Sequence, residues 1–381
     1  TVLEEACAKG RTEVVRLVLE GDLVKGAQEY DRALEAASSS GHTAIVRLLL
    51  ENGADINPAG IPVLQTASSS GQLDVVRILL DSGADVNALG GEYCTALQAA
   101  SCKGHESVVQ LLLSHGAHVD TLGGLYYSAL QAASHGGHQK IVQLLIGQGA
   151  NVNVQGGVYG SALQAASYNG HEETVRLLLE AGADINESRG KYGSALQAAS
   201  YGGHTATTLL LLQQGADIKA KGDEFYTALQ GASYNGHEET VGLLLEARAD
   251  INESGGKYGS ALQAASHGGH IEIACLLLEQ GADINKRGGE YCTALQAASC
   301  KGHAEAVRLL LEKGADVNAL GGNYGNALQA ASYEGHEETM VLLLDAGADM
   351  ASGGISGNAL VAAYQGHTAI VCLLLKRGAN I

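Results

Sequence analysis

The sequence repeats itself at a constant spacing of about 33 residues. The hexapeptide Ala-Leu-Gln-Ala-Ala-Ser marks the period, and one copy carries Gly at its fourth place. The copies begin at Ala96, Ala129, Ala162, Ala195, Ala228, Ala261, Ala294 and Ala327. Related segments, some at slightly shorter spacings, begin at Val2, Ala33, Val63 and Ala359 and bring the number of units to twelve. A repeat of this length is one supersecondary unit that cannot bury its apolar face alone, so the units must stack.

The charge balance restricts the partners of the chain. It has 41 acidic and 23 basic residues and a formal net charge of −18, which repels nucleic acid and anionic membranes at long range. The sequence shows neither a run of 18 apolar residues nor a basic segment followed by an apolar leader. We therefore expect a soluble, cytoplasmic, monomeric chain with no nucleic-acid and no membrane partner.

The seven cysteines favour free thiols. Cys94 and Cys102 recur as Cys292 and Cys300, six periods later. Copying explains this recurrence better than disulfide pairing, because a helix separates the two members of each pair. Reduced cysteines in a cytosol are therefore predicted.

One unit, residues 156–188, reads as two helices followed by a hairpin. Ser161 and Gln164 form a capping box at the start of the first helix, and Gly170 ends that helix. The second helix opens at His171, and Gly182 then provides a left-handed cap. The predicted buried stripe of this helix is Val175 and the leucine triad Leu177, Leu178 and Leu179. The same capping pair recurs at Thr95/Gln98, Ser128/Gln131, Ser194/Gln197, Thr227/Gln230, Ser260/Gln263 and Thr293/Gln296.

These features resemble the ankyrin repeat family. The resemblance rests on the length of the period, on Gly-His between the helices, and on Leu-Leu-Leu followed by Gly-Ala-Asp-Ile-Asn, as at Leu276 to Asn285. It implies an all-α ankyrin-repeat solenoid of helix-turn-helix units joined by β-hairpin-like loops. Where the family usually has Thr-Pro-Leu-His, this chain has Ser/Thr-Ala-Leu-Gln, so the family's proline and histidine roles are not carried over. The motif Tyr-Gly-Ser-Ala-Leu-Gln is similar to that of the repeat arrays in fungal nucleotide-binding, NACHT-type, innate-immunity-like receptors.

The resemblance covers the whole chain, which we interpret as one ankyrin repeat domain, 1–381, with about twelve repeats. The first, 1–26, lacks a hairpin and carries Glu4 and Glu5 where later units have Gln and Ala, as a capping repeat would. The central repeats span 27–352. A partial C-terminal repeat spans 353–381.

The histidines carry no predicted metal site. Ten of them share one place between the two helices of a unit, and neighbouring helices lie about 8 to 10 Å apart, so their rings cannot share a zinc ion with bonds of about 2 Å. We expect each ring to bond to loop backbone instead. The ten are His42, His105, His138, His171, His204, His237, His270, His303, His336 and His367.

No motif for catalysis occurs in the sequence. It lacks a Walker-type loop, a Gly-x-Ser-x-Gly elbow and a His-Glu-x-x-His motif. Paired carboxylates such as Glu238 and Glu239 recur at helix starts, where they favour the helix dipole. We therefore predict no enzymatic activity and no cofactor.

Comparison of the repeats within the chain separates constant from varying places. The tip series, just before the hairpin tyrosine, comprises Glu92, Leu125, Val158, Lys191, Glu224, Lys257, Glu290 and Asn323. The post-tyrosine series comprises Cys94, Tyr127, Gly160, Gly193, Tyr226, Gly259, Cys292 and Gly325. The helix-end series comprises Cys102, His135, Tyr168, Tyr201, Tyr234, His267, Cys300 and Tyr333. The hairpin aromatics hardly vary, which predicts packing between repeats for Tyr93, Tyr126, Tyr159, Tyr192, Phe225, Tyr258, Tyr291 and Tyr324.

The resemblance places the three varying series in a concave groove, where tyrosine suits protein recognition. We expect these places to be more exposed than the leucine triads. The candidate contacts to a partner are Tyr127, His135, Tyr168, Lys191, Tyr201, Tyr226, Tyr234, Lys257, His267 and Tyr333.

The preferred function is a non-catalytic module that binds a protein or peptide, as part of a larger receptor or adaptor. Two alternatives stay open, a designed or structural scaffold without a specific partner and a non-catalytic region of a larger enzyme. One local exception is informative: Arg248 stands where ten other units have a capping glycine, so a left-handed backbone is predicted at Arg248.

Overall fold

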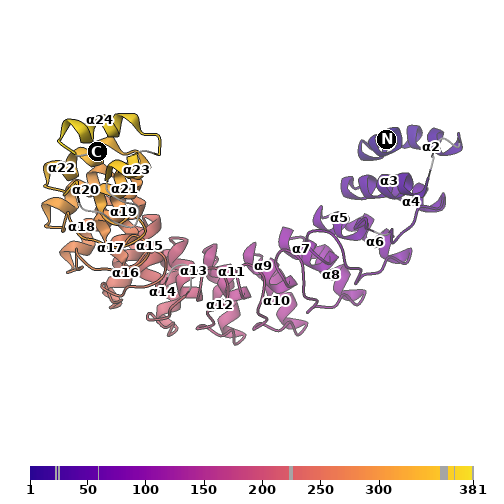
Figure 1. Ribbon diagram of the computed structural model, residues 1–381. Helices are drawn as coiled ribbons and strands as arrows, with labels where there is room; N and C mark the ends of the chain where they lie inside the picture. The colour runs from indigo at the N-terminus through magenta and orange to yellow at the C-terminus, as the bar shows by residue number, and fades with distance from the viewer. Residues whose placement is uncertain are drawn as a thin grey trace. The chain divides into compact units, whose positions relative to one another are not determined.

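The computed structural model describes residues 1–21, 24, 26–58, 60–222, 226–351, 359–363 and 365–379. Over these residues it contains 24 helices and no extended strand, so the predicted all-helical fold is confirmed. The chain divides into two compact units, Thr1–Asp184 and Ile185–Ile381. In each unit the helices alternate between a first and a second helix of a repeat, as Figure 1 shows.

The unit Thr1–Asp184 contains twelve helices in its described part. Its first helices are α1 (Val2–Ala8), α3 (Ala27–Ser40), α5 (Val63–Ser69), α7 (Ala96–Lys103), α9 (Ala129–His135) and α11 (Ala162–Tyr168). Its second helices are α2 (Thr12–Glu20), α4 (Thr43–Glu51), α6 (Leu73–Asp81), α8 (Glu106–Ser114), α10 (Gln139–Gly147) and α12 (Glu172–Glu180). Each first helix packs on the next first helix, and each second helix on the next second helix.

The unit Ile185–Ile381 follows the same pattern. Its first helices are α13 (Ala195–Tyr201), α15 (Ala228–Asn235), α17 (Ala261–Gly268), α19 (Ala294–Lys301), α21 (Ala327–Glu334) and α23 (Ala359–Ala363). Its second helices are α14 (Thr205–Gln213), α16 (Glu238–Glu246), α18 (Ile271–Glu279), α20 (Ala304–Glu312), α22 (Glu337–Asp345) and α24 (Thr368–Lys376).

The first helices form the core of each unit. In α11 every residue from Ala162 to Ser167 is buried, because small alanines and serines let neighbouring helices approach closely. In α12 only Val175 and Leu178 of the predicted stripe are fully buried, whereas Leu177 and Leu179 are half-buried. The prediction of a wholly buried leucine triad is therefore wrong, since consecutive residues of a helix cannot all face one neighbour.

The hairpin loops close through isolated antiparallel bridges. These join Gly90 to Cys94, Gly123 to Tyr127, Gly156 to Gly160, Gly255 to Gly259, Gly288 to Cys292 and Gly321 to Gly325. The predicted capping boxes begin the first helices after these loops. Both halves of the box form at Thr95, Ser194, Thr227, Ser260 and Thr293. At Ser128 and Ser161 only one half forms, so the prediction of a full box is wrong there: each hydroxyl accepts from the backbone N–H of the glutamine three residues later, but the glutamine Oε1 has no donor among the described residues.

The inter-helix histidines bond to backbone, as predicted, but the carbonyl that each ring contacts belongs to the preceding repeat, which was not predicted. In nine described cases Nε2 lies 2.9 to 3.2 Å from the carbonyl oxygen at or near the end of the preceding first helix, for example His138 to Cys102. The ring also covers the glycine of the preceding repeat. A Cβ on Gly104, whose φ is +79°, would lie 2.6 Å from Cε1 of His138. The Gly-His pair therefore belongs to the interface between repeats.

Arg248 adopts the predicted left-handed backbone, with φ of +66°. Its counterparts Gly182 and Gly281 have φ of +86° and +91°. The arginine therefore ends α16 in the same geometry that glycine provides elsewhere, at a conformational cost of about 1 kcal/mol.

Candidate protein-binding surface

The tip series lies on the outer turn of each hairpin. Every member that the structure describes is exposed, and the apolar ones, Leu125 and Val158, are 42% and 47% exposed. Glu224 lies outside the described residues. This series combines variation with exposure, which is the pattern expected of a surface that recognises a partner.

Backbone hydrogen bonds join three pairs of consecutive tips. The N–H of Leu125 donates to the carbonyl of Glu92 at 3.0 Å, that of Glu290 to Lys257 at 2.9 Å, and that of Asn323 to Glu290 at 2.9 Å. The tips thus form short ladders in which side chains change while the backbone spacing does not. Such a ladder presents a fixed row of variable side chains.

The post-tyrosine series packs between hairpins, so the prediction that it is exposed is wrong for most of its members. Gly160, Gly193, Gly259 and Gly325 are buried, and Cys292 is 8% exposed. The backbone is left-handed there, even at Cys94, Tyr127 and Cys292, where φ is +73°, +70° and +67°.

The side chains of this series fill space beside a glycine of the next hairpin. A Cβ on Gly255 would lie 2.6 Å from the ring of Tyr226, and one on Gly321 would lie 2.6 Å from Sγ of Cys292. Where this place carries a side chain, a glycine of the neighbouring hairpin therefore leaves the room that the side chain occupies. Tyr127 and Tyr226 are half-buried and leave only part of each ring accessible.

The helix-end series and the hairpin tyrosines form one aromatic column in each unit, not two separate rows. In Thr1–Asp184 the ring of His135 lies 4.8 Å from Tyr126 and 4.9 Å from Tyr159, and Tyr159 lies 5.5 Å from Tyr168. These are ordinary separations for packed rings. The predicted packing role of the hairpin tyrosines is confirmed there.

The unit Ile185–Ile381 shows the same interleaving. The ring of Tyr234 lies 4.4 Å from Tyr258, and His267 lies 5.1 Å from Tyr258 and 4.8 Å from Tyr291. Tyr192 packs on Tyr201 at 5.3 Å, and Tyr324 packs on Tyr333 at 5.6 Å. Phe225, the aromatic predicted for one hairpin, lies outside the described residues.

Exposure in the helix-end series is uneven. Tyr168, Tyr201 and Tyr234 are half-buried, whereas Leu178, Leu211 and Leu244 are fully buried, as predicted. Tyr333 is 38% exposed and His135 half-buried. His267 and Cys300 are only 8% and 2% exposed, so the prediction is wrong for these two residues. The rings of Tyr258 and Tyr291 pack against His267.

His267 occupies an apolar setting. Its Nε2 lies 3.0 Å from the hydroxyl of Tyr291, and burial, with smaller effects from Lys301 and His303, lowers its pKa to about 4. Burial likewise raises the pKa of Tyr291 to about 12. At neutral pH this part of the column is uncharged.

Lysines lie over tyrosine rings at two tips. Nζ of Lys191 is 5.1 Å from the centre of the Tyr192 ring, and Nζ of Lys257 is 5.4 Å from that of Tyr258. Both lysines are exposed. A cation–π contact of this length restrains the ammonium group while leaving it available to an acidic partner.

The thiols and carboxylates do not assemble a reactive centre in the described part of the chain. All seven cysteines are free, and burial raises the pKa of Cys102 and of Cys300, which disfavours the reactive thiolate. Over the same residues no group of three or more His, Cys, Asp and Glu side chains is placed to hold a metal ion. No described helix has the length and apolar character needed to cross a bilayer.

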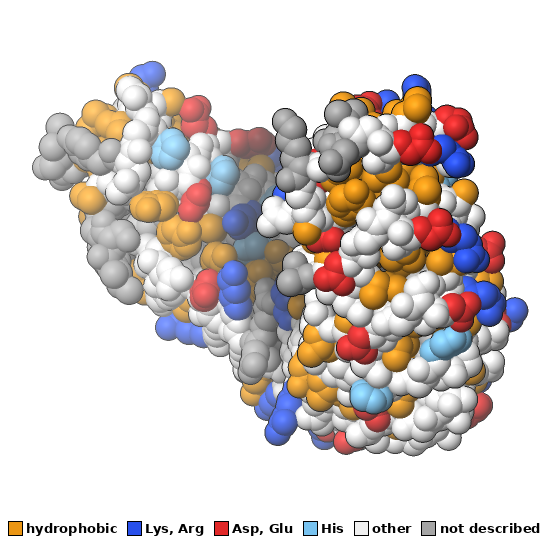
Figure 2. Space-filling view, turned by 90° about the vertical axis from the view of Figure 1, so that its right-hand side faces the viewer, with side chains coloured by type: hydrophobic (Ala, Val, Ile, Leu, Met, Phe, Trp, Pro, Cys, Tyr) orange, Lys and Arg blue, Asp and Glu red, His pale blue; other side chains and the backbone are white. Residues whose placement is uncertain are grey.

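On the face shown in Figure 2 acidic, basic, apolar and uncharged side chains are interspersed, without a broad area of one sign. The excess of acidic residues in the sequence is thus not gathered into one patch on this face.

The sequence is matched by the family model for ankyrin repeats (3 copies) over residues 1–59, 57–123, 118–189, 163–255, 195–288 and 261–354. The chain belongs to the ankyrin repeat family. This ankyrin array is also similar in fold to the human ASB11 ankyrin repeat domain, with a TM-score of 0.52 and 24% sequence identity over 58% of this chain and 98% of that one. A search of curated proteins finds no match. Ankyrin repeats are generally modules for protein–protein interaction and are typically non-catalytic.

Proposed function

We propose that this ankyrin array is a non-catalytic arm that binds a protein or peptide through the hairpin side of its repeats. The observation that carries the proposal is the tip series, where exposed side chains vary from repeat to repeat and backbone hydrogen bonds join three pairs of consecutive tips. Varying side chains at exposed places of a rigid frame are what a surface selected for a particular partner requires.

The two units offer different chemistry at their tips. Leu125 and Val158 give the unit Thr1–Asp184 neighbouring apolar tips, whereas Lys191 and Lys257 give the other unit basic ones. Apolar tips bind by burial of area and lysines select acidic groups. We infer that a partner carries apolar and acidic side chains in separate segments.

The aromatic columns support the tips. Tyr127, His135 and Tyr168 in the first unit and Tyr201, Tyr226, Tyr234 and Tyr333 in the second expose part of each ring, and we propose that these exposed edges extend the contact surface. Packed tyrosines lose little conformational entropy on binding. For His267, which is 8% exposed, the role we propose is to orient Tyr258 and Tyr291 beneath the partner.

We further propose that the array is monomeric, cytoplasmic and part of a larger receptor or adaptor similar to the fungal NACHT-type receptors. Within it, residues 1–26 would serve as the N-terminal capping repeat, 27–352 as the central repeats and 353–381 as a partial repeat. The motif Tyr-Gly-Ser-Ala-Leu-Gln of the hairpins supports the resemblance to these receptors.

The test compares charge changes on two sides of the repeats, and the lysine tip variant and the control shift the net charge by the same amount. A partner captured by the wild-type array is purified and titrated against Leu125→Asp with Val158→Asp, against Lys191→Glu with Lys257→Glu, and against Lys140→Glu with Arg308→Glu on the outer face of the second helices. We expect at least a tenfold loss of affinity for one or both tip variants and less than a twofold change for the control, whose ion pairs are exposed and weak. Equal losses for tips and control would contradict the proposal.

A further inference from the structure

In the unit Thr1–Asp184 the backbone hydrogen bond that joins the tips Leu125 and Glu92 is not continued on the other side of Glu92. The repeat that begins at Val63 follows the one that begins at Ala33 at a shorter spacing than the regular period, and the loop before α5 lacks the Gly-Gly pair and the tyrosine of a regular hairpin. Pro62 lies against the next hairpin, 3.1 Å from the place of a Cβ on Gly91. The shortened loop therefore leaves no regular hairpin beside Glu92 on the side of the preceding repeat. We call this place the step.

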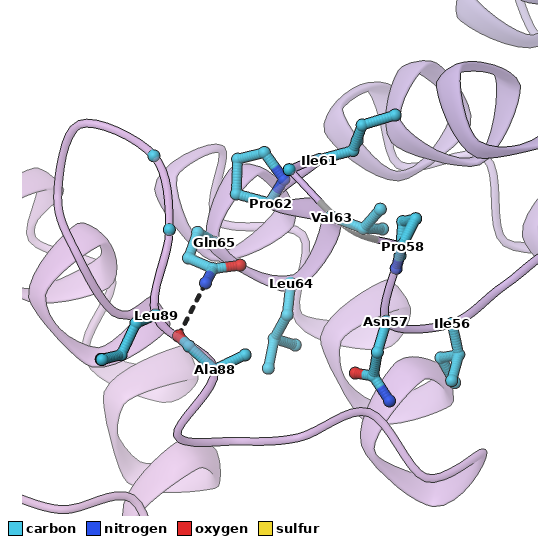
Figure 3. Close-up of a pocket in the computed structure, with 13 residues that line it drawn as sticks. Ile56, Asn57, Pro58, Ile61, Pro62, Val63, Leu64, Gln65, Ala88 and Leu89 are labelled. Carbon is cyan, nitrogen blue, oxygen red and sulfur yellow. Dashed lines mark hydrogen bonds between the residues drawn. The ribbon is translucent and has the colours of Figure 1, made fainter. Parts of the chain in front are cut away.

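A pocket of about 240 Å³ opens at this step. Figure 3 shows Leu64 and Gln65 of α5 between the loop that carries Pro58 and the hairpin that carries Ala88 and Leu89. Its apolar lining comprises Ile56, Pro58, Ile61, Pro62, Leu64 and Leu89. The volume lies below the range of about 300 to 1,000 Å³ typical of small-molecule sites, which favours a single apolar side chain as its occupant.

One buried polar side chain of the pocket has an unused acceptor. Gln65 is 6% exposed, and its Nε2 donates to the carbonyl of Ala88 at 2.8 Å. In six regular repeats the glutamine Oε1 accepts from the N–H of the capping residue, as Gln98 does from Thr95 at 3.0 Å. At Gln131 and Gln164 the Oε1 atom has no donor among the described residues. Here the capping residue is Pro62, which has no N–H. In the described part of the chain Oε1 of Gln65 therefore has no donor, and in Figure 3 it points away from Ala88.

The backbone of Glu92 offers the complementary group. Its carbonyl accepts from Leu125, as the ladder requires, but its N–H finds no acceptor among the described residues. The equivalent N–H groups of Leu125, Glu290 and Asn323 each donate to the preceding tip, whereas those of Val158 and Lys191 do not. Glu92 differs from Val158 and Lys191 in that no regular hairpin precedes it. Glu92 is thus an open edge of the ladder, adjoining Gly91 of the pocket wall.

We propose that an extended segment of a partner polypeptide occupies this step as a substitute hairpin. Its carbonyl would accept from Glu92 N–H, its N–H would donate to Gln65 Oε1, and its apolar side chain would fill the pocket. The segment continues the backbone ladder that already joins Glu92 to Leu125, which is how peptides add to an exposed edge. The inference rests on the proposed function, and it assigns the peptide's anchor to one place.

The experiment selects ligands and then maps them with matched variants. A random library of short peptides is selected on the whole wild-type chain, and the enriched peptides are synthesised and titrated by fluorescence anisotropy. Leu89→Lys changes the pocket rim, and Leu122→Lys changes the same place one repeat later. Leu89 is 70% and Leu122 48% exposed, so neither change disturbs the core. A third variant replaces residues 58–62 by residues 88–95 and so restores a regular hairpin.

We expect peptides that share an essential apolar residue, bind the wild type, lose at least tenfold in affinity with Leu89→Lys and with the restored hairpin, and change less than twofold with Leu122→Lys. Enrichment of no peptide, or equal sensitivity to the two lysine variants, would overturn the inference. Peptides that respond only to Lys191→Glu with Lys257→Glu would overturn it while leaving the proposed function standing. Self-association that Leu89→Lys abolishes would assign the pocket to a second copy of the chain and overturn it too.

Discussion

Nε2 of Gln296 lies 3.0 Å from the carbonyl oxygen of Gly325 in the following hairpin. The same nitrogen lies 3.1 Å from the carbonyl of Ala319 and 3.2 Å from that of Gly321. Meanwhile Oε1 of Gln296 accepts from the N–H of Thr293 at 3.0 Å. One glutamine thus caps its own helix and holds the next hairpin, so a change at this place affects two repeats.

Gln296→Glu should lower the free energy of unfolding by about 2 to 4 kcal/mol at pH 7, because a buried carboxylate would face three carbonyl oxygens. The folded state would raise the pKa of the new carboxyl, so the loss should shrink as the pH falls toward its ordinary pKa near 4.3. Urea unfolding at pH 7.5 and pH 5 measures both effects. Gln280→Glu, at an exposed helix end, is the control and should change the free energy by less than about 0.5 kcal/mol. A loss independent of pH would contradict this account.

His138→Ala should cost about 1 to 2 kcal/mol, since it leaves the carbonyl of Cys102 without its donor and uncovers Gly104. His138→Gln should cost less, because Gln72 naturally holds this place and donates to the carbonyl of Ser39 at 3.3 Å. The denaturant concentrations at which the two variants are half unfolded show which variant is the less stable. If glutamine were as costly as alanine, the hydrogen bond would not be what the histidine contributes.

Arg248→Gly should raise the free energy of unfolding by about 1 kcal/mol, because glycine adopts a φ of +66° without steric cost. Arg248→Ala separates the backbone from the side chain and should leave stability nearly unchanged, since alanine carries the same Cβ. Thermal unfolding of both variants without any ligand tests the argument. A lower midpoint for the glycine variant would mean that the guanidinium stabilises the array.

His267 should make the unit Ile185–Ile381 less stable in mild acid. Its folded pKa, about 4, lies below the ordinary value near 6.5, so between these values the unfolded state binds a proton that the folded state does not. The free energy of unfolding should therefore fall as the pH drops from about 6.5 to about 4.

The control for this prediction is His267→Tyr, which places in this repeat the residue that Tyr234 and Tyr333 provide in others. It should reduce the slope of unfolding free energy against pH by up to about 1.4 kcal/mol per pH unit. Part of the slope should persist, because burial also lowers the pKa of His303. An unchanged slope in the tyrosine variant would show that His267 titrates normally.

Periodicity alone sufficed to predict the helix pairs, five of the seven capping boxes and the bonding of the histidines to backbone, because these depend on residues close in sequence or repeated in every unit. The left-handed backbone at Arg248 was predictable for the same reason. Ten other units have glycine at this place, which indicates a left-handed backbone that the arginine must also adopt.

The burial of the varying places was not predictable in this way. Comparison of repeats shows that Cys292 and His267 vary, but it does not show that a glycine of the next hairpin or a neighbouring tyrosine covers them. Variation within a chain therefore marks recognition only where the place is also exposed, as at Leu125 and Lys257. The pocket beside Glu92 had a signal in the sequence, the shortened spacing before Val63, but its meaning depends on the ladder of tips that the structure reveals.

The most direct test of the central claim is the cross-linking footprint of a bound partner. A photo-reactive amino acid is placed in turn at the tips, at Leu125, Val158, Lys257 and Asn323, and on the outer faces of second helices, at Lys140, Glu239 and Arg308. After irradiation of the complex, the yield of covalent adduct is measured by mass spectrometry. The account predicts adducts from two or more tips and none above background from the second helices. Adducts mainly from Lys140, Glu239 and Arg308 would contradict it.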